Sequence, residues 1–199
     1  MTEHAVGMPE SLATADVWEW LEIRSGYRIG DRTAIEHTHT HTTVARPTHT
    51  QRFFERRFQW TGSSDTATRP EILSSSDGHD HVMHGPTYTE DDWTYYLVDL
   101  GHRVPAGQTE TITTQQTFLD EKRTFKPYFR LLVRQPLQRL ELTVDLPDNL
   151  AVRLRPTWTD GVSGNPYSVN SLNFHTDGSH AVLEVPNPQL GTEYGIAWL

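Results

Sequence analysis

The sequence contains no cysteine, and only two of its 17 basic residues are lysines. The absence of cysteine excludes disulfide scaffolds, thiolate zinc fingers, iron–sulfur clusters and cysteine nucleophiles. No apolar run approaches the roughly 20 residues that a membrane-spanning helix needs, and the polar first residues lack the pattern of a signal peptide. We therefore expect a cytoplasmic protein, in which any transition metal would have to bind histidine and carboxylate side chains.

The charge of the chain is acidic overall but unevenly distributed. A net charge of −9 argues against a general nucleic-acid-binding protein, because such proteins neutralise phosphates. Residues 121–155 nevertheless carry eight basic and four acidic side chains, a local charge of +4 that leaves −13 for the rest. A basic patch could receive a protein partner with an acidic surface, or a phosphorylated ligand. Its candidate residues are Arg130, Arg134, Arg153 and Arg155.

The dominant hydrophobic period is two, which is typical of β-strands with one buried face. Residues 140–146 show it most clearly, and residues 151–155 and 194–198 repeat it. We expect nine of these residues to be buried: Leu140, Leu142, Val144, Leu146, Val152, Leu154, Tyr194, Ile196 and Trp198. Further strands are expected at residues 17–24, 32–44, 51–60, 93–100, 108–119, 128–134 and 180–185.

These strands recur at short intervals with turn residues between them, as in β-sandwiches and barrels. We predict a single all-β domain over residues 1–199, an immunoglobulin-like two-sheet β-sandwich of roughly 9–11 strands. At most one short helix is expected, near the N-terminus. Residues 1–16 are expected to be flexible, and residues 61–92 are expected to form a long irregular loop rich in histidine.

The first candidate site lies in the predicted strand at residues 32–44. His37, His39 and His41 would project from one face, with neighbouring side chains about 6.7 Å apart. Two such imidazoles can bind one zinc ion, so His39 and His41 are candidate metal ligands. The alternative is a polar face in contact with solvent, on an edge strand or a partly covered strand.

The second candidate site is the segment with the spacing His79-x-His81-x-x-His84. This spacing resembles the histidine motif of the metallo-β-lactamase fold, but Met83 stands where that family has the aspartate of its second metal site. The resemblance implies a zinc-dependent hydrolase. The alternative is a solvated loop. If both histidine clusters met, their imidazoles could hold zinc, nickel or copper; no other cofactor is expected.

Residues 52–60 interleave basic and aromatic side chains, a combination that can bind single-stranded nucleic acid. Because the whole chain is acidic, a core strand is the better interpretation, with Phe54, Arg56 and Phe58 on one face and Arg57 on the other. Neither a Gly-x-Ser-x-Gly nucleophile motif nor a glycine-rich phosphate loop is present. The sequence therefore favours a non-enzymatic protein.

The second half of the chain has a recognisable order of features. A Pro105-Ala106-Gly107 turn precedes a polar strand, followed by residues 127–130, residues 136–144 and the ending Tyr194-Gly195-Ile196-Ala197-Trp198. Over residues 18–199 this order resembles an uncharacterised β-sandwich domain of actinobacteria, which often follows helix-turn-helix regulatory domains. The resemblance implies a cytosolic sensory or interaction module.

Together these observations predict a non-enzymatic binding or protein-interaction module with a regulatory role. Two alternatives remain open. One is a histidine-ligated metalloprotein, such as a metal-dependent hydrolase. The other is a structural or assembly protein whose exposed strand edges pair with other copies.

Overall fold

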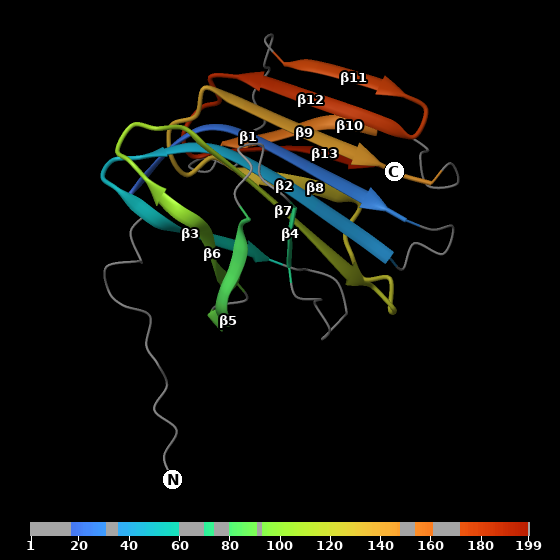
Figure 1. Ribbon diagram of the computed structural model, residues 1–199. Helices are drawn as coiled ribbons and strands as arrows, with labels where there is room; N and C mark the ends of the chain where they lie inside the picture. The colour runs from blue at the N-terminus through green and yellow to red at the C-terminus, as the bar shows by residue number, and fades with distance from the viewer. Residues whose placement is uncertain are drawn as a thin grey trace.

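The computed structural model describes seven segments of the chain: residues 17–30, 36–59, 70–73, 80–90, 93–147, 154–160 and 172–198. All regular structure in these segments is β-strand (Figure 1). The first strands are β1 (Trp18–Ile29), β2 (Glu36–Pro47), β3 (Gln51–Gln59), β4 (Glu71–Leu73), β5 (Val82–Glu90) and β6 (Trp93–Val104). They are followed by β7 (Glu110–Leu119), β8 (Tyr128–Leu132), β9 (Arg139–Asp145), β10 (Leu154–Asp160), β11 (Asn173–Asp177), β12 (His180–Pro186) and β13 (Thr192–Trp198).

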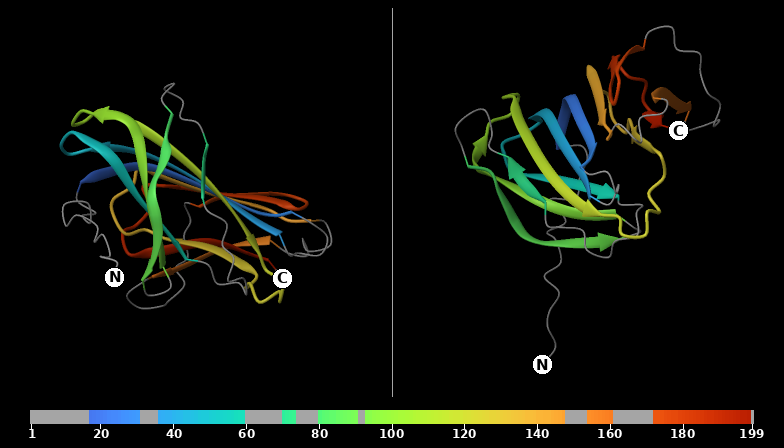
Figure 2. Two further views of the ribbon diagram at one scale, coloured as in Figure 1. Left: turned by 60° about the horizontal axis from the view of Figure 1, so that its bottom comes forward. Right: turned by 90° about the vertical axis from the view of Figure 1, so that its right-hand side faces the viewer.

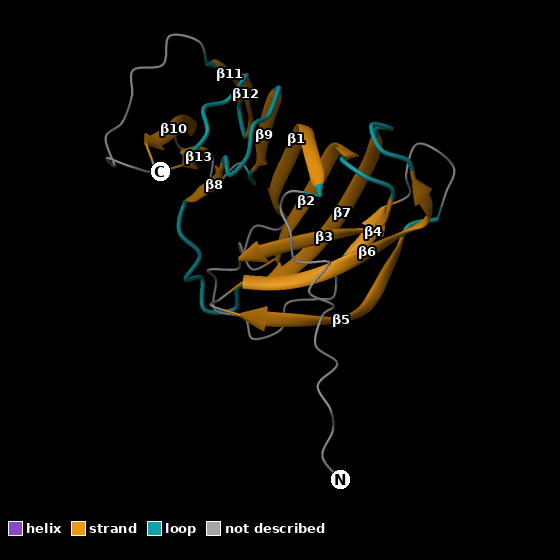
Figure 3. Cartoon of the chain, turned by 90° about the vertical axis from the view of Figure 1, so that its left-hand side faces the viewer, coloured by secondary structure: helices purple, strands orange, loops and turns teal. Residues whose placement is uncertain are grey.

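One large sheet organises the fold. Its seven strands have the order β11-β12-β9-β1-β2-β7-β4, and two three-stranded sheets have the orders β10-β13-β8 and β3-β6-β5. Every pair in these sheets is antiparallel except β1 with β9, which is parallel. Figures 2 and 3 show the two small sheets at different ends of the large one, with β8, β10 and β13 near β9 and β12, and β3, β5 and β6 near β2 and β7.

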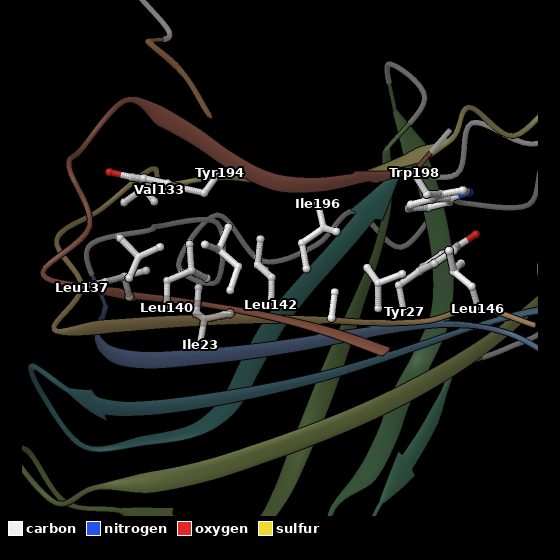
Figure 4. Packing of buried hydrophobic residues seen from close by; sticks show 14 of the residues in the cluster. Ile23, Tyr27, Val133, Leu137, Leu140, Leu142, Leu146, Tyr194, Ile196 and Trp198 are labelled. Atoms are coloured by element: carbon white, nitrogen blue, oxygen red, sulfur yellow. The ribbon is translucent and has the colours of Figure 1, made fainter. Parts of the chain in front are cut away.

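Two hydrophobic clusters fill the space between the large sheet and the small ones. In the first, Tyr194 and Ile196 of β13 lie over Leu140 and Leu142 of β9, and Trp198 stacks on Tyr27 of β1 (Figure 4). The second brings Trp18 of β1 together with buried side chains of β2, β3, β6 and β7. The large sheet therefore buries one face of its central strands and leaves the other face largely polar.

The predicted all-β class is confirmed, and the seven predicted core residues whose side chains are described are all buried. Val152 and the side chain of Leu154 lie outside the described set. Residues 18–24 of the strand predicted at 17–24 belong to strand β1. The described residues form 13 strands in three sheets, whereas the sequence predicts roughly 9–11 strands in two sheets. Some of the additional strands, such as β4 and β11, are short and lack a clear alternation.

The prediction of an irregular loop over residues 61–92 is wrong in part, because this stretch contains β4 and β5. Strand β5 was missed because it contains Gly85 and Pro86, which are unfavourable in strands, and its register with β6 shifts between His84 and Tyr88. Residues 1–16, which we expected to be flexible, lie outside the described residues. In the described part of the chain, no helix has the length and apolar character needed to cross a membrane.

Candidate functional site

The histidines of β2 lie in the interior. The alternative of a solvated edge strand is wrong, because β2 pairs with both β1 and β7, and His37 and His41 are only 2% and 8% exposed. Ser25 Oγ lies 2.8 Å from His39 Nε2 and 3.0 Å from His41 Nδ1, and Tyr27 forms a hydrogen bond with His37 Nδ1. These side chains form a polar seam between β1 and β2 on the buried face of the large sheet.

Arg56 of β3 enters the same region from the facing sheet. It is 7% exposed and donates a hydrogen bond to Thr43 Oγ1 at 3.2 Å. Burial lowers the pKa of its guanidinium, which nevertheless remains charged. Burial, helped by this charge, lowers the pKa of His39 to about 4 and that of His41 well below its usual value. Both imidazoles are therefore neutral at physiological pH.

A serine hydroxyl between two imidazoles resembles a nucleophile with its general base. Ser25, however, is 2% exposed, so a substrate cannot reach its hydroxyl without opening the fold. No described carboxylate bonds to His39 or His41 to orient the imidazole as a base. The arrangement therefore satisfies buried polar groups and does not support acyl transfer.

The second histidine cluster is divided between two environments. His81 is buried with its Nε2 3.4 Å from Glu110 Oε1, and Glu110 Oε2 lies 3.4 Å from His102 Nε2. His84 is exposed, and its ring lies 4.8 Å from the ring of Phe53. Among the described residues, no group of three or more histidine, aspartate or glutamate side chains is arranged to hold a metal ion. His79 lies outside the described residues, so a zinc site that includes it stays a prediction.

The structure keeps the described members of the two histidine clusters apart. His41 lies opposite Thr114 of β7, whereas His81 contacts Glu110 at the start of the same strand. Four residues of an extended strand span about 13 Å. In addition, the Arg56 charge beside His39 and His41 opposes the binding of a cation there.

The predicted arginine patch is likewise divided. Arg130 of β8 and Arg155 of β10 lie on either side of β13, opposite Gly195 and Ala197, and Arg130 pairs with Glu193 at 3.3 Å. Arg134 follows the end of β8 and lies elsewhere, with its guanidinium 5.0 Å from the ring centre of Trp93. Arg153 lies outside the described residues.

The structure brings a different set of residues together on the outer face of the β3-β6-β5 sheet. Arg57, Tyr95 and Tyr88 lie side by side across its three strands. The guanidinium of Arg57 lies 5.1 Å from the ring centre of Trp93, so two arginines, Arg57 and Arg134, form cation–π contacts with this indole. The rings of Tyr88 and Tyr95 stack at 4.8 Å. We call these five residues the Arg–Trp face.

Among the side chains that the structure describes, the charges on the Arg–Trp face are incompletely balanced. Partial burial, together with the charge of Arg57, lowers the pKa of the Arg134 guanidinium. Neither arginine belongs to an ion pair between described residues. Glu55 is nearby on β3, where burial raises the pKa of its carboxyl and Arg57 partly opposes this effect. Among the described side chains, Glu55 thus supplies a partly buried carboxyl that interacts with Arg57.

The sequence predicts Phe54, Arg56 and Phe58 on one face of a core strand and Arg57 on the other, and the structure confirms this alternation and buries the first three. It did not find the Arg–Trp face, because the face joins β3, β5, β6 and the segment after β8. The alternation of each strand was visible, but nothing in the sequence shows which strands are neighbours.

No protein-family model matches the sequence, and no curated protein matches it. Solved structures do show the same fold. A candidate protease from Parabacteroides distasonis has a TM-score of 0.55 at 11% identity over 93% of this chain. An M1 zinc metallopeptidase from Deinococcus radiodurans has a TM-score of 0.51 at 9% identity over 90% of this chain. Leukotriene A4 hydrolase from Saccharomyces cerevisiae has a TM-score of 0.51 at 9% identity over 100% of this chain.

This chain spans 41%, 42% and 32% of the length of those three proteins, respectively. At such low identity the likeness concerns the fold alone. A β-structure of this kind therefore occurs as one part of larger proteins.

Proposed function

We propose that the chain is a non-enzymatic cytoplasmic module that binds an acidic protein segment through the Arg–Trp face. The observation that supports this most is the indole of Trp93 with the guanidiniums of Arg57 and Arg134 at 5.1 and 5.0 Å. Neither guanidinium has a described carboxylate as an ion-pair partner. Carboxylates of a partner can therefore supply the missing charge.

The composition of the Arg–Trp face also supports a protein partner. Tryptophan, tyrosine and arginine are the residues most enriched in the energetic centres of protein interfaces. Tyr88 is 39% exposed although its ring stacks on Tyr95, so aromatic surface remains available. The indole of Trp93, which is part of strand β6, contacts both guanidiniums and restricts their motion, which reduces the entropy lost on binding.

The chemistry of the interior favours binding over catalysis. The serine and histidines of the polar seam are enclosed, and the described residues include no group of three metal ligands. Similarity to a part of much larger proteins is compatible with a module that acts by contacting other protein structure. The resemblance to a domain that follows regulatory domains suggests the same kind of role.

The test is a fluorescence-anisotropy titration with a fluorescein-labelled, glutamate-rich peptide containing tyrosine. We expect saturable binding at low ionic strength that weakens as salt is added. The double variant Arg57→Gln/Arg134→Gln should lose about tenfold in affinity, as expected for two exposed charge contacts. The matched control is Arg130→Gln/Arg155→Gln, which removes the same charge from the outer face of the β10-β13-β8 sheet.

Each outcome is informative. Binding that is lost only in the Arg57/Arg134 variant supports the proposal. Equal losses in both variants would mean that net charge alone drives binding, and a loss confined to the control would place the site on β8 and β10. Either of these results, or no binding by the wild type, overturns the proposal.

A further inference from the structure

The polar face of the large sheet contains a groove on the side away from both hydrophobic clusters. The groove has a volume of about 480 Å³ and is lined by residues of β1, β2, β7 and β9. This volume lies within the range of small-molecule sites, roughly 300–1,000 Å³. None of the residues of the Arg–Trp face lines it.

The centre of the groove is Gly26 of β1. Its cross-strand neighbours are Thr40 of β2 and Thr143 of β9. A Cβ atom at Gly26 would lie 2.8 Å from Thr143 Oγ1, so the threonine hydroxyl leans over the space that the glycine leaves open. A ligand here would meet hydroxyl groups at close range on a rigid floor of central strands.

Hydroxyl and amide groups continue along β2 and β7. Thr38, Thr40 and Thr42 share the outer face of β2 at steps of about 6.7 Å. Thr40 Oγ1 lies 3.4 Å from Gln115 Oε1, and Thr42 Oγ1 lies 3.0 Å from Thr113 Oγ1. Hydroxyl groups both donate and accept hydrogen bonds, so this surface suits a ligand whose own groups do both.

The charged side chains of the groove nearly cancel one another. Arg24 and Arg28 line it together with Glu36, Glu141 and Asp145. The register places Arg24 beside Glu141 and Arg28 beside Asp145. The resulting charge of −1 disfavours phosphates and other anions, and the two guanidiniums disfavour a simple cation. The lining side chains that face the groove are all polar, which disfavours an apolar ligand.

We propose that this groove binds a neutral oligosaccharide. Such a ligand is uncharged and carries adjacent hydroxyl groups, each of which donates and accepts hydrogen bonds. It can therefore pair with the threonine hydroxyls, while Arg28 and the carboxylates supply stronger, charge-assisted hydrogen bonds. Because the groove is open and has no aromatic platform on its outer side chains, binding is weak, with a dissociation constant in the high micromolar to millimolar range.

The experiment is an NMR titration of the isotope-labelled full chain with maltotetraose, cellotetraose, xylotetraose and tetra-N-acetylchitotetraose. We expect at least one sugar to shift the amide signals of Gly26, Thr40 and Thr143 in a saturable way. Thr40→Val keeps the shape and β-propensity of the side chain but removes its hydroxyl, and it should weaken binding about fivefold. Arg28→Gln, a second substitution at an exposed position, should also weaken binding of the sugar.

Thr111→Val is the matched control, because Thr111 is on the same sheet face but does not line the groove. Its affinity should equal that of the wild type. Failure of every sugar to shift the groove signals would overturn the proposal. Binding by Thr40→Val and Arg28→Gln with the affinity of the wild type would also overturn it. Binding of charged sugars or peptides alone would also overturn it. None of these results depends on the acidic peptide that tests the Arg–Trp face.

Discussion

Replacing Arg56 with methionine should stabilise the protein. Arg56 is 7% exposed, and its described hydrogen-bond partners are the hydroxyl groups of Thr43 and Tyr96. No described carboxylate forms an ion pair with it. A buried charge without a counter-ion carries a desolvation cost of several kcal/mol that hydroxyl partners offset only in part.

The size of the effect follows from what remains after the substitution. Methionine keeps most of the apolar stem in place, so little packing is lost. Tyr96 still donates to Thr114 Oγ1 at 3.1 Å, whereas Thr43 Oγ1 loses a donor, which costs about 1 kcal/mol. The net expectation is a gain of about 1–3 kcal/mol in the free energy of unfolding.

Urea denaturation followed by tryptophan fluorescence measures this gain, with an unchanged dependence on denaturant as the sign of an intact native state. The control is Arg57→Met at the adjacent exposed position, which should change stability by no more than about 0.5 kcal/mol. A loss of more than about 1 kcal/mol in Arg56→Met would refute the reasoning, because it would show that the guanidinium is compensated by an anionic group.

Three further predictions concern the same fold. Burial lowers the pKa of His39 from 6.5 to about 4, so the free energy of unfolding should fall by at most about 3 kcal/mol as the pH drops from about 6.5 to about 4. Urea titrations at several pH values should show a smaller fall in His39→Gln than in the wild type. Asp120 is 1% exposed and accepts hydrogen bonds from the amides of Thr124 and Phe125 at 3.1 and 2.8 Å. Asp120→Ala should therefore lower the free energy of unfolding by about 2–4 kcal/mol, and an unchanged melting temperature in thermal denaturation would contradict this. A Cβ atom at Gly195 would lie 2.4 Å from the Phe129 carbonyl oxygen of the neighbouring strand β8. Because this clash weakens the pairing of the two strands, Gly195→Ala should speed hydrogen exchange of the β8 amides, and unchanged protection would contradict this.

The sequence predicted the fold best where side chains alternate over a long stretch. Leu140, Leu142 and Val144 alternate with polar residues, and all three are fully buried in β9. The parallel pairing of β9 with β1 could not be predicted, because it depends on contacts between residues more than 100 positions apart. Alternation gives the face of a side chain but does not identify the neighbouring strand.

The same limit explains the outcome for the candidate sites. The shared face of His37, His39 and His41 was correctly predicted, but not its burial, since two polar faces gave no indication of which one is inside. Arg134 was grouped with Arg130 on the assumption that the strand reaches residue 134. Strand β8 ends at Leu132, and beyond this point Arg134 turns to Trp93 instead.

The proposal that the Arg–Trp face is the recognition surface can be tested most directly by NMR during titration with the glutamate-rich peptide. The protein has six tryptophans, so the indole signal of Trp93 can be assigned from a Trp93→Phe variant. We predict that this signal and the Nε signals of Arg57 and Arg134 shift together and saturate at one peptide concentration. Shifts confined to Arg130 and Arg155, with the Trp93 indole unchanged, would contradict the account.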